Sequence, residues 1–290
     1  MKPRSKPIKK TVFVIVIWIS ALIIGKMLGK FIVGEAAEQE LAASFISSTI
    51  LYSFVTFILL LLIKIMKLDS VAKDLCNINF RMGLFPLLAL FLCFTGDLFL
   101  FFKFVNLIAN QNILNDSKFV FSGPFSLLLA LFFYAAVGFS EELCFRGILL
   151  KFWLFHFTYN NNGRIKAAFV TSILFGMVHL VNLSNGLNAA NVIYTFSQIL
   201  FATMYGIFFS AILYKTKSIW LCGLIHGMIN FVGNISDIFI PKHIMDSVPT
   251  GMLIGYSRLE SIITVLVISP GFFWAIHFML RNIKNDGDQI

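Results

Sequence analysis

Two adjacent carboxylates and an arginine lie inside a stretch of apolar residues. Residues 139–147 read FSEELCFRG, near the end of an apolar run that would otherwise be typical of a membrane span. Each charge at the centre of a membrane helix costs roughly 2.5–3.5 kcal/mol, which makes such residues candidates for function. On a helix, Glu142 and Arg146 share a face and can pair, whereas Glu141 points about 100° away and has no cation on its own helix. We therefore expect Glu142 and Arg146 to support a site in which Glu141 is free for chemistry.

Two further pairs of residues at helical spacing lie in other apolar runs. Phe175 and His179 are four residues apart in LFGMVHL. His226 and Asn230 are four residues apart in LIHGMIN. The members of each pair therefore point the same way. Counted from the expected cytoplasmic ends of their runs, Glu141, His226 and His179 lie roughly 15, 12 and 18 Å deep, so these side chains can meet in one cavity.

A carboxylate beside two imidazoles in a dry cavity is suited to hydrolysis. The carboxylate takes a proton from water, one histidine orients that water, and histidine or asparagine donors stabilise an oxyanion. Gly223 and Gly227 flank His226 in a GxxxG spacing. This spacing permits close helix packing and would bring the imidazole toward the helix that carries the carboxylates.

The composition is that of an integral membrane protein. Of the 290 residues, 58% are hydrophobic and 13% are charged, against about 25% charged in soluble domains. A membrane-spanning helix needs about 20 apolar residues. Eight runs reach or approach this length, at residues 11–34, 41–63, 83–102, 122–150, 167–183, 190–214, 218–240 and 258–280. We predict an all-α, polytopic membrane protein with about eight transmembrane helices, a single integral membrane domain over residues 1–290, and the site inside the helix bundle.

The distribution of basic residues predicts the orientation. With a cytoplasmic N-terminus, most of the 23 Lys and Arg residues fall on the inner side, and the exceptions outside are Lys103, Lys118, Lys242 and Arg258. Because cytoplasmic loops carry an excess of Lys and Arg, we expect a multi-pass protein of the cell membrane with both termini in the cytoplasm. The net charge of +9 has the same origin, so we expect no nucleic-acid partner.

Several polar residues have a purely structural interpretation. A lone histidine or asparagine in a membrane helix often joins two helices by a hydrogen bond. We expect Phe175 to be a packing residue, Asp97 to be structural or interfacial, and His277 to lie at the membrane interface. His156 and His243 are placed in loops and are assigned no role. Cys76, Cys93, Cys144 and Cys222 lack the spacing of a disulfide framework or of a cysteine metal site.

Taken together, the three motifs resemble those of a known protease family. The segments Glu141-Glu142-Leu-Cys-Phe-Arg146, Phe175-Gly-Met-Val-His179 and His226-Gly-Met-Ile-Asn230 are similar to the EExxxR, FxxxH and HxxxN motifs of the CPBP intramembrane proteases. This family, also called the Abi or CAAX-protease family, includes the type II CAAX prenyl endopeptidase. The resemblance covers about residues 122–235 and implies a catalytic core there. It implies that Glu141 activates water with His179, that His226 and Asn230 form an oxyanion hole, and that Glu142 and Arg146 support the site.

No cofactor is firmly implied. The zinc signature HExxH is absent, although His179, His226 and a glutamate could form a three-ligand zinc site, and we favour a mechanism without metal. The expected partners are the lipid bilayer and a peptide or membrane-protein substrate that enters from the cytoplasmic side. Two alternatives stay open: a membrane protein that binds a peptide without cutting it, such as a bacteriocin-immunity factor, and a transporter that uses Glu141 and the histidines as a proton relay.

Overall fold

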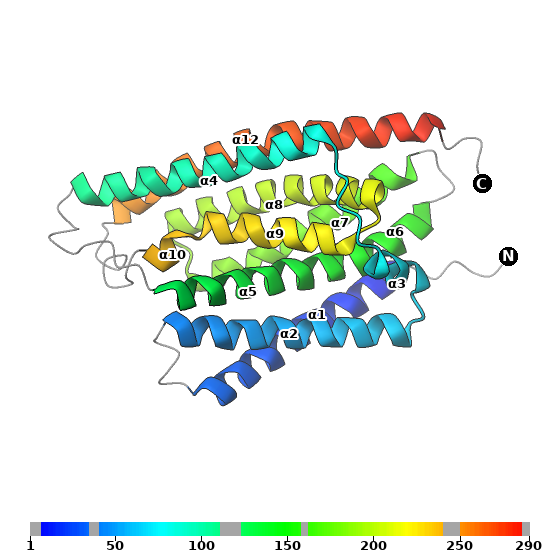
Figure 1. The fold of residues 1–290 in the computed structure, drawn as a ribbon, viewed down its shortest axis with the longest axis horizontal. Helices are drawn as coiled ribbons and strands as arrows, with labels where there is room; N and C mark the ends of the chain where they lie inside the picture. Colours follow the sequence, from blue (N-terminus) through cyan, green and yellow to red (C-terminus); the bar gives the residue numbers. More distant parts are fainter. Residues whose placement is uncertain (1–6, 35–40, 111–122, 158–161, 240–249, 286–290) are drawn as a thin grey trace.

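The computed structural model describes residues 7–34, 41–110, 123–157, 162–239 and 250–285, and every regular element in these ranges is a helix (Figure 1). The elements are α1 (Pro7–Val33), α2 (Leu41–Ile65), α3 (Asp69–Cys76), α4 (Leu84–Asn110), α5 (Gly123–Glu142), the π-helix η2 (Leu143–Leu149), α6 (Leu150–Phe157), α7 (Gly163–Met177), the 3₁₀-helix η3 (Val178–Asn185), α8 (Ala189–Thr216), α9 (Ile219–Gly233), α10 (Ser236–Phe239) and α12 (Thr250–Asn285). The predicted all-α class is confirmed. Lys2, Arg4, Lys6, Lys118, Lys242 and His243, which entered the sequence-based predictions, lie outside the described residues.

Seven helical segments of the described chain are long and apolar enough to cross a membrane. One of them joins α5, η2 and α6 into a single span of 35 residues, Gly123–Phe157. Large apolar side chains such as Phe31 and Phe273 are exposed on the outside of the bundle, with exposed fractions of 86% and 65%. Since lipid replaces water around such side chains, the protein is a multi-pass membrane protein.

The seventh predicted run differs most from its helix. Residues 218–240 were expected to form one span, but α9 ends at Gly233 after 15 residues, and the short helix α10 follows. Gly and Asn are frequent where helices end, and here Asn234 closes the helix by donating its backbone N–H to the carbonyl of Asn230. The eight apolar runs therefore correspond to seven long spans and one shorter apolar helix.

One helix was not predicted at all. Residues 69–76, expected to be part of a polar connection, form α3. Its first turn carries Asp69 and its last turn Lys73, as the helix dipole favours. Asp74 of α3 forms an ion pair with Lys151 of α6 at 2.6 Å, and this contact ties the connection to the end of the bundle.

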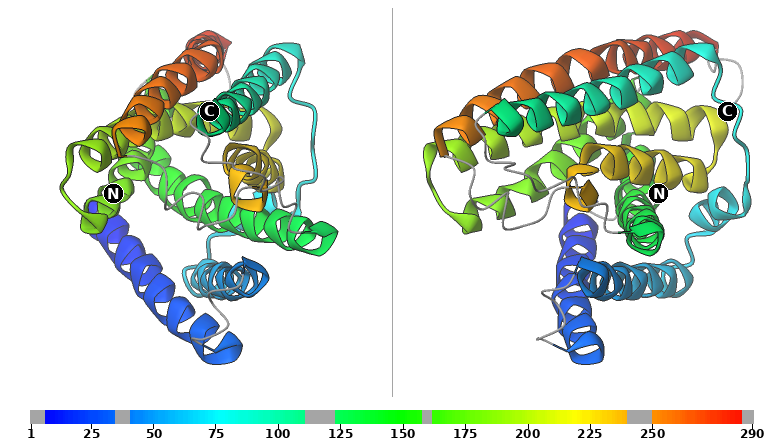
Figure 2. Two further views of the ribbon diagram at one scale, coloured as in Figure 1. Left: turned by 90° about the vertical axis from the view of Figure 1, so that its left-hand side faces the viewer. Right: turned by 60° about the vertical axis from the view of Figure 1, so that its left-hand side comes forward.

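The helices pack in three layers (Figure 1, Figure 2). Helices α4 and α12 lie side by side, α5, α7, α8 and α9 form the middle, and α1 crosses α2 on the far side. The first residues of α1 and the last residues of α12 lie at the same end of the bundle (Figure 1). This agrees with an even number of crossings, while the side that faces the cytoplasm stays a prediction.

Glycines bring α5 and α9 into close contact in the middle layer. A Cβ atom at Gly227 would lie 2.8 Å from the Cα atom of Ala135, and one at Gly223 would lie 2.9 Å from the Cα atom of Phe139. On α5, Gly138 faces the backbone of both glycines. Only residues without a Cβ atom allow this approach, so the close helix contact predicted from GxxxG is present.

Candidate active site

The two adjacent glutamates lie where the helix geometry changes. Helix α5 ends at Glu142, and the chain continues as the π-helix Leu143–Leu149, all of whose residues are buried. The wider turn is marked by the backbone N–H of Leu150, which donates to the carbonyl of Phe145, five residues earlier. π-Helical turns are rare and are frequent at functional sites.

Glu142 and Arg146 form the ion pair that their spacing predicts. Arg146 Nη1 lies 3.0 Å from Glu142 Oε1, and both side chains are completely buried. The guanidinium carbon also lies 4.4 Å from the ring centroid of Phe175 and 5.6 Å from that of Phe209. Helix α8 leaves room for this group because a Cβ atom at Gly206 would lie 2.7 Å from Arg146 Nη2.

His226 lies between the two glutamates. Its Nδ1 is 2.8 Å from Glu142 Oε1, a hydrogen bond, and its Nε2 is 3.7 Å from Glu141 Oε2. The imidazole stacks on Phe209, with centroids 5.3 Å apart and planes inclined by 23°. Glu142 therefore holds both Arg146 and His226, and it fixes the ring with Nε2 directed toward Glu141.

His179 is oriented by the backbone of its own helix. Helix α7 tightens into the 3₁₀-helix η3 at Val178, and His179 Nδ1 lies 3.2 Å from the carbonyl oxygen of Phe175 and 3.3 Å from that of Gly176. A nitrogen that faces carbonyl oxygens carries the proton, which leaves Nε2 as an acceptor. The Phe175 ring packs edge-on against both His179 and His226, with centroids 5.5 and 5.7 Å away.

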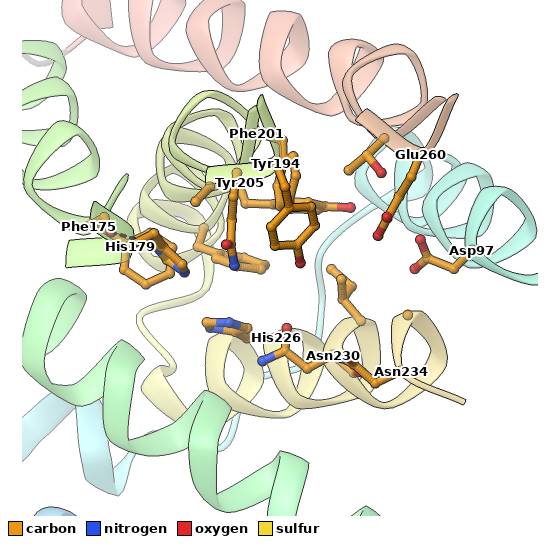
Figure 3. A pocket seen from close by; sticks show the side chains of 16 residues that line it. Asp97, Phe175, His179, Tyr194, Phe201, Tyr205, His226, Asn230, Asn234 and Glu260 are labelled. Atoms are coloured by element: carbon orange, nitrogen blue, oxygen red, sulfur yellow. Dashed lines mark hydrogen bonds between the residues drawn. The ribbon is translucent and has the colours of Figure 1, made fainter. Parts of the chain in front are cut away.

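A cavity of about 130 Å³ brings three of the predicted residues together. His179, His226 and Asn230 line it together with Phe175 and Phe209 of α7 and α8 (Figure 3). Asn230 follows His226 by one turn of α9 and lies on the same side of the helix (Figure 3).

Glu141 is not among the residues that line this cavity. It reaches the site through Nε2 of His226, and its side chain keeps an exposed fraction of 16%. The structure thus places Glu141 beside His226, whereas the resemblance paired it with His179.

Several residues of the site were not found from the sequence. Phe209 and Gly206 gave no signal, because a chain with 34 Phe and 19 Gly residues offers many equivalent positions. Glu260 of α12 lines the far end of the cavity, and an acidic residue within the last apolar run was a signal that could have found it. Asp97, expected to be structural or interfacial, lines the cavity as well.

The arrangement of possible metal ligands does not match a zinc centre. Within the part of the chain that the structure describes, no three His, Cys, Asp or Glu side chains gather closely enough to hold a metal ion, whereas protein zinc sites use three or four such ligands. Nδ1 of His226 is already engaged by Glu142. We therefore derive the chemistry of the site from its side chains alone.

Comparison with known proteins gives one match. Residues 123–232 match the family model described as Rce1-like, type II CAAX prenyl endopeptidase. No curated protein and no solved structure matches the chain. The matched stretch runs from the start of α5 to α9 and contains the EExxxR, FxxxH and HxxxN segments. Through this helical core, the chain is similar to the CPBP, or CAAX-protease, family of membrane proteases.

Proposed function

We propose that the protein is an intramembrane endopeptidase that hydrolyses a peptide or membrane-protein substrate with a water molecule activated by Glu141. The observation that carries the proposal is the position of His226. Its two ring nitrogens face two carboxylates of different environment, Glu142 at 2.8 Å and Glu141 at 3.7 Å. One carboxylate is used to position the ring, and the other is available for the reaction.

Glu141 is the general base in this scheme. A separation of 3.7 Å from His226 Nε2 is too long for a hydrogen bond but suits a bridging water. Glu142 is less suited to this role because its side chain is completely buried and its Oε1 atom contacts both Arg146 and His226. A carboxylate held next to water in an apolar site is an effective proton acceptor and typically contributes 10²–10⁴-fold in rate.

His226 and Asn230 are the proposed oxyanion donors. The carboxylate of Glu142 accepts the Nδ1–H of His226 and stabilises the ring when it is positively charged, so that Nε2–H can donate to a developing oxyanion. The Asn230 amide lies one turn away on the same face of α9 and adds a neutral donor (Figure 3). His179, with its free Nε2, is placed to orient the water or accept a proton from it.

The cavity favours an entry route that differs from the one expected from the sequence. Its lining includes the start of α8 (Tyr194), the end of α9 (Gly233) and the first half of α12 (Glu260). These segments lie at the end of the bundle opposite the start of α1 and the end of α12 (Figure 1). We therefore propose that the substrate approaches from the membrane face opposite the termini rather than from the cytoplasmic face.

Proteolysis by the purified protein tests the function directly. Wild type and Glu141→Ala, both in lipid nanodiscs, would be incubated with a panel of synthetic membrane peptides and the products analysed by mass spectrometry. We expect defined fragments from wild type, none from Glu141→Ala, and wild-type products from a control, Asp69→Ala, which removes an exposed carboxylate of α3. Peptides that bind to wild type but stay intact would instead identify a peptide-binding protein.

A further inference from the structure

The end of the cavity away from His226 carries two carboxylates from different helices. Asp97 of α4 and Glu260 of α12 both line it (Figure 3), and they are close enough to interact electrostatically. Asp97 Oδ2 is buried and has no hydrogen-bond partner. Among the described residues, no ion pair neutralises either carboxylate.

Two carboxylates at this depth stay ionised only with a compensating positive charge. Like charges that share a site disfavour each other, and burial in a membrane bundle adds to that cost. Of the described residues that line the cavity, only His179 and His226 can become cationic, and both lie at its other end. The charge pattern therefore points to a cation supplied from outside the chain.

Tyr205 gives an independent indication of a ligand at this place. Its side chain is buried, with an exposed fraction of 7%, and it lines the same cavity from α8. Its hydroxyl group interacts with the Cys93 thiol and has no oxygen or nitrogen partner in the described residues. A hydroxyl oxygen has two lone pairs, so this group, like the carboxylates, can accept a hydrogen bond from a donor that enters the cavity.

We propose that Asp97, Glu260 and Tyr205 form an acidic subsite that binds a cationic nitrogen of the substrate, either a Lys or Arg side chain or a free N-terminal amine. Ammonium and guanidinium groups are pure donors, which matches a set of acceptors. The proposal rests on the proposed endopeptidase function. It also implies that a substrate with a free C-terminal carboxylate at this end of the cavity is disfavoured by repulsion.

The geometry limits how far the cation lies from the bond that is cut. Asp97 Oδ2 lies 3.8 Å from the position of a Cβ atom at Gly233. Gly233 follows His226 by two turns of α9, or about 10 Å. An extended peptide covers about 3.3 Å per residue, which places the cation within about three residues of the scissile bond. A volume of about 130 Å³ is suited to one side chain or end group there.

A binding experiment on an inactive protein separates this proposal from the catalytic one. The probes are apolar decapeptides that carry a single Lys, Gln or Glu. In one series of peptides this residue is placed at each position in turn, and every peptide is made with a free and with an acetylated N-terminus. Binding to the full-length Glu141→Gln protein in nanodiscs is measured by fluorescence anisotropy. The best Lys or free-amine peptide should bind at least about tenfold more tightly than its Gln or acetylated counterpart, as hydrogen bonds to charged groups allow. Loss of the preference on acetylation assigns the cation to the N-terminus, and loss on Lys→Gln assigns it to the side chain.

Variants of the subsite make the test decisive. Asp97→Asn combined with Glu260→Gln should abolish the preference, Asp97→Glu should keep it, and the exposed control Asp69→Asn should leave it unchanged. Equal binding of Lys, Gln and acetylated peptides, or a preference that survives the double substitution in protein that melts like its parent, overturns the subsite. Charge-dependent binding without cleavage by the Glu141-containing protein refutes the endopeptidase function and leaves the subsite intact. Cleavage by the Glu141-containing protein without any charge preference in binding refutes the subsite and leaves the endopeptidase function intact.

Discussion

At the scale of single residues, the two adjacent glutamates differ in what surrounds them. Glu142 is completely buried and contacts both Arg146 and His226, whereas Glu141 keeps an exposed fraction of 16% and lies 3.7 Å from Nε2 of His226. The ion pair of Glu142 was predictable from the sequence, because Arg146 lies four residues after it. The hydrogen bond from His226 was not, because it joins residues 84 positions apart and depends on how two helices cross.

Removal of Arg146 should destabilise the whole protein. The Arg146→Ala variant leaves Glu142 buried without its cation, and breaking such a pair typically costs about 3–5 kcal/mol. The amount of folded protein in membranes and its melting temperature should both fall, together with activity. If the variant accumulates and melts like wild type but is inactive, Arg146 acts directly in the reaction and its supporting role is wrong.

Chelation tests the role of the histidines. Since no three suitable ligands gather in the described residues, we expect proteolysis to continue after incubation with EDTA and dialysis. The check is the cleavage rate before and after treatment, with and without added zinc. Loss of activity that zinc restores would make His179 and His226 metal ligands, and their assignment as water-orienting and oxyanion groups would then fall.

At the scale of helices, the site depends on the close contact of α5 and α9. The sequence predicts this contact from Gly223 and Gly227 and also predicts which residues share a face of each helix. It does not predict the π-helix after Glu142 or the 3₁₀-helix at Val178, because intrinsic propensity does not decide between these turns and ordinary α-helix. Tertiary packing decides between these helix types, and residues 143–149 are all buried.

Widening the α5–α9 contact should disturb catalysis and stability together. In Gly227→Ala, the new Cβ atom would lie 2.8 Å from Ala135 Cα and from the carbonyl oxygen of Tyr134, so the helices must separate. Overpacking of this kind typically costs about 1–3 kcal/mol, and it would move His226 away from Glu142. Thermal melting and cleavage rate measure the two effects.

The matched control lies on the same helix. At Gly233, a Cβ atom would be no closer than 3.8 Å to any neighbour, so Gly233→Ala should melt like wild type. Equal melting temperatures for the two alanine variants would show that the close contact does not hold the helices in place.

At the scale of the whole molecule, the distribution of apolar runs predicted most of the architecture. The exceptions are places where polar chemistry decides: the early end of α9 at Gly233, and α3, whose Asp74 pairs with Lys151. The route to the site was not predictable either, because the cavity is formed by α4, α7, α8, α9 and α12 together.

The basic residues predict that both termini face the cytoplasm, so that the cavity extends toward the outer half of the membrane. A reporter that is active only in the cytoplasm, fused after Ile290, should be active, and one that is active only outside should be inactive. The opposite pattern would reverse the orientation of the bundle and bring the cavity to the cytoplasmic half.

The central claim is that Glu141 is the base that activates water, and the turnover of Glu141→Gln tests it most directly. Glutamine keeps the size of the side chain and removes its basicity, so with a peptide that wild type cuts, the cleavage rate should fall by at least about 100-fold while the affinity for that peptide stays largely unchanged. A Glu141→Gln protein that cuts the same peptide at the wild-type rate would contradict the mechanism.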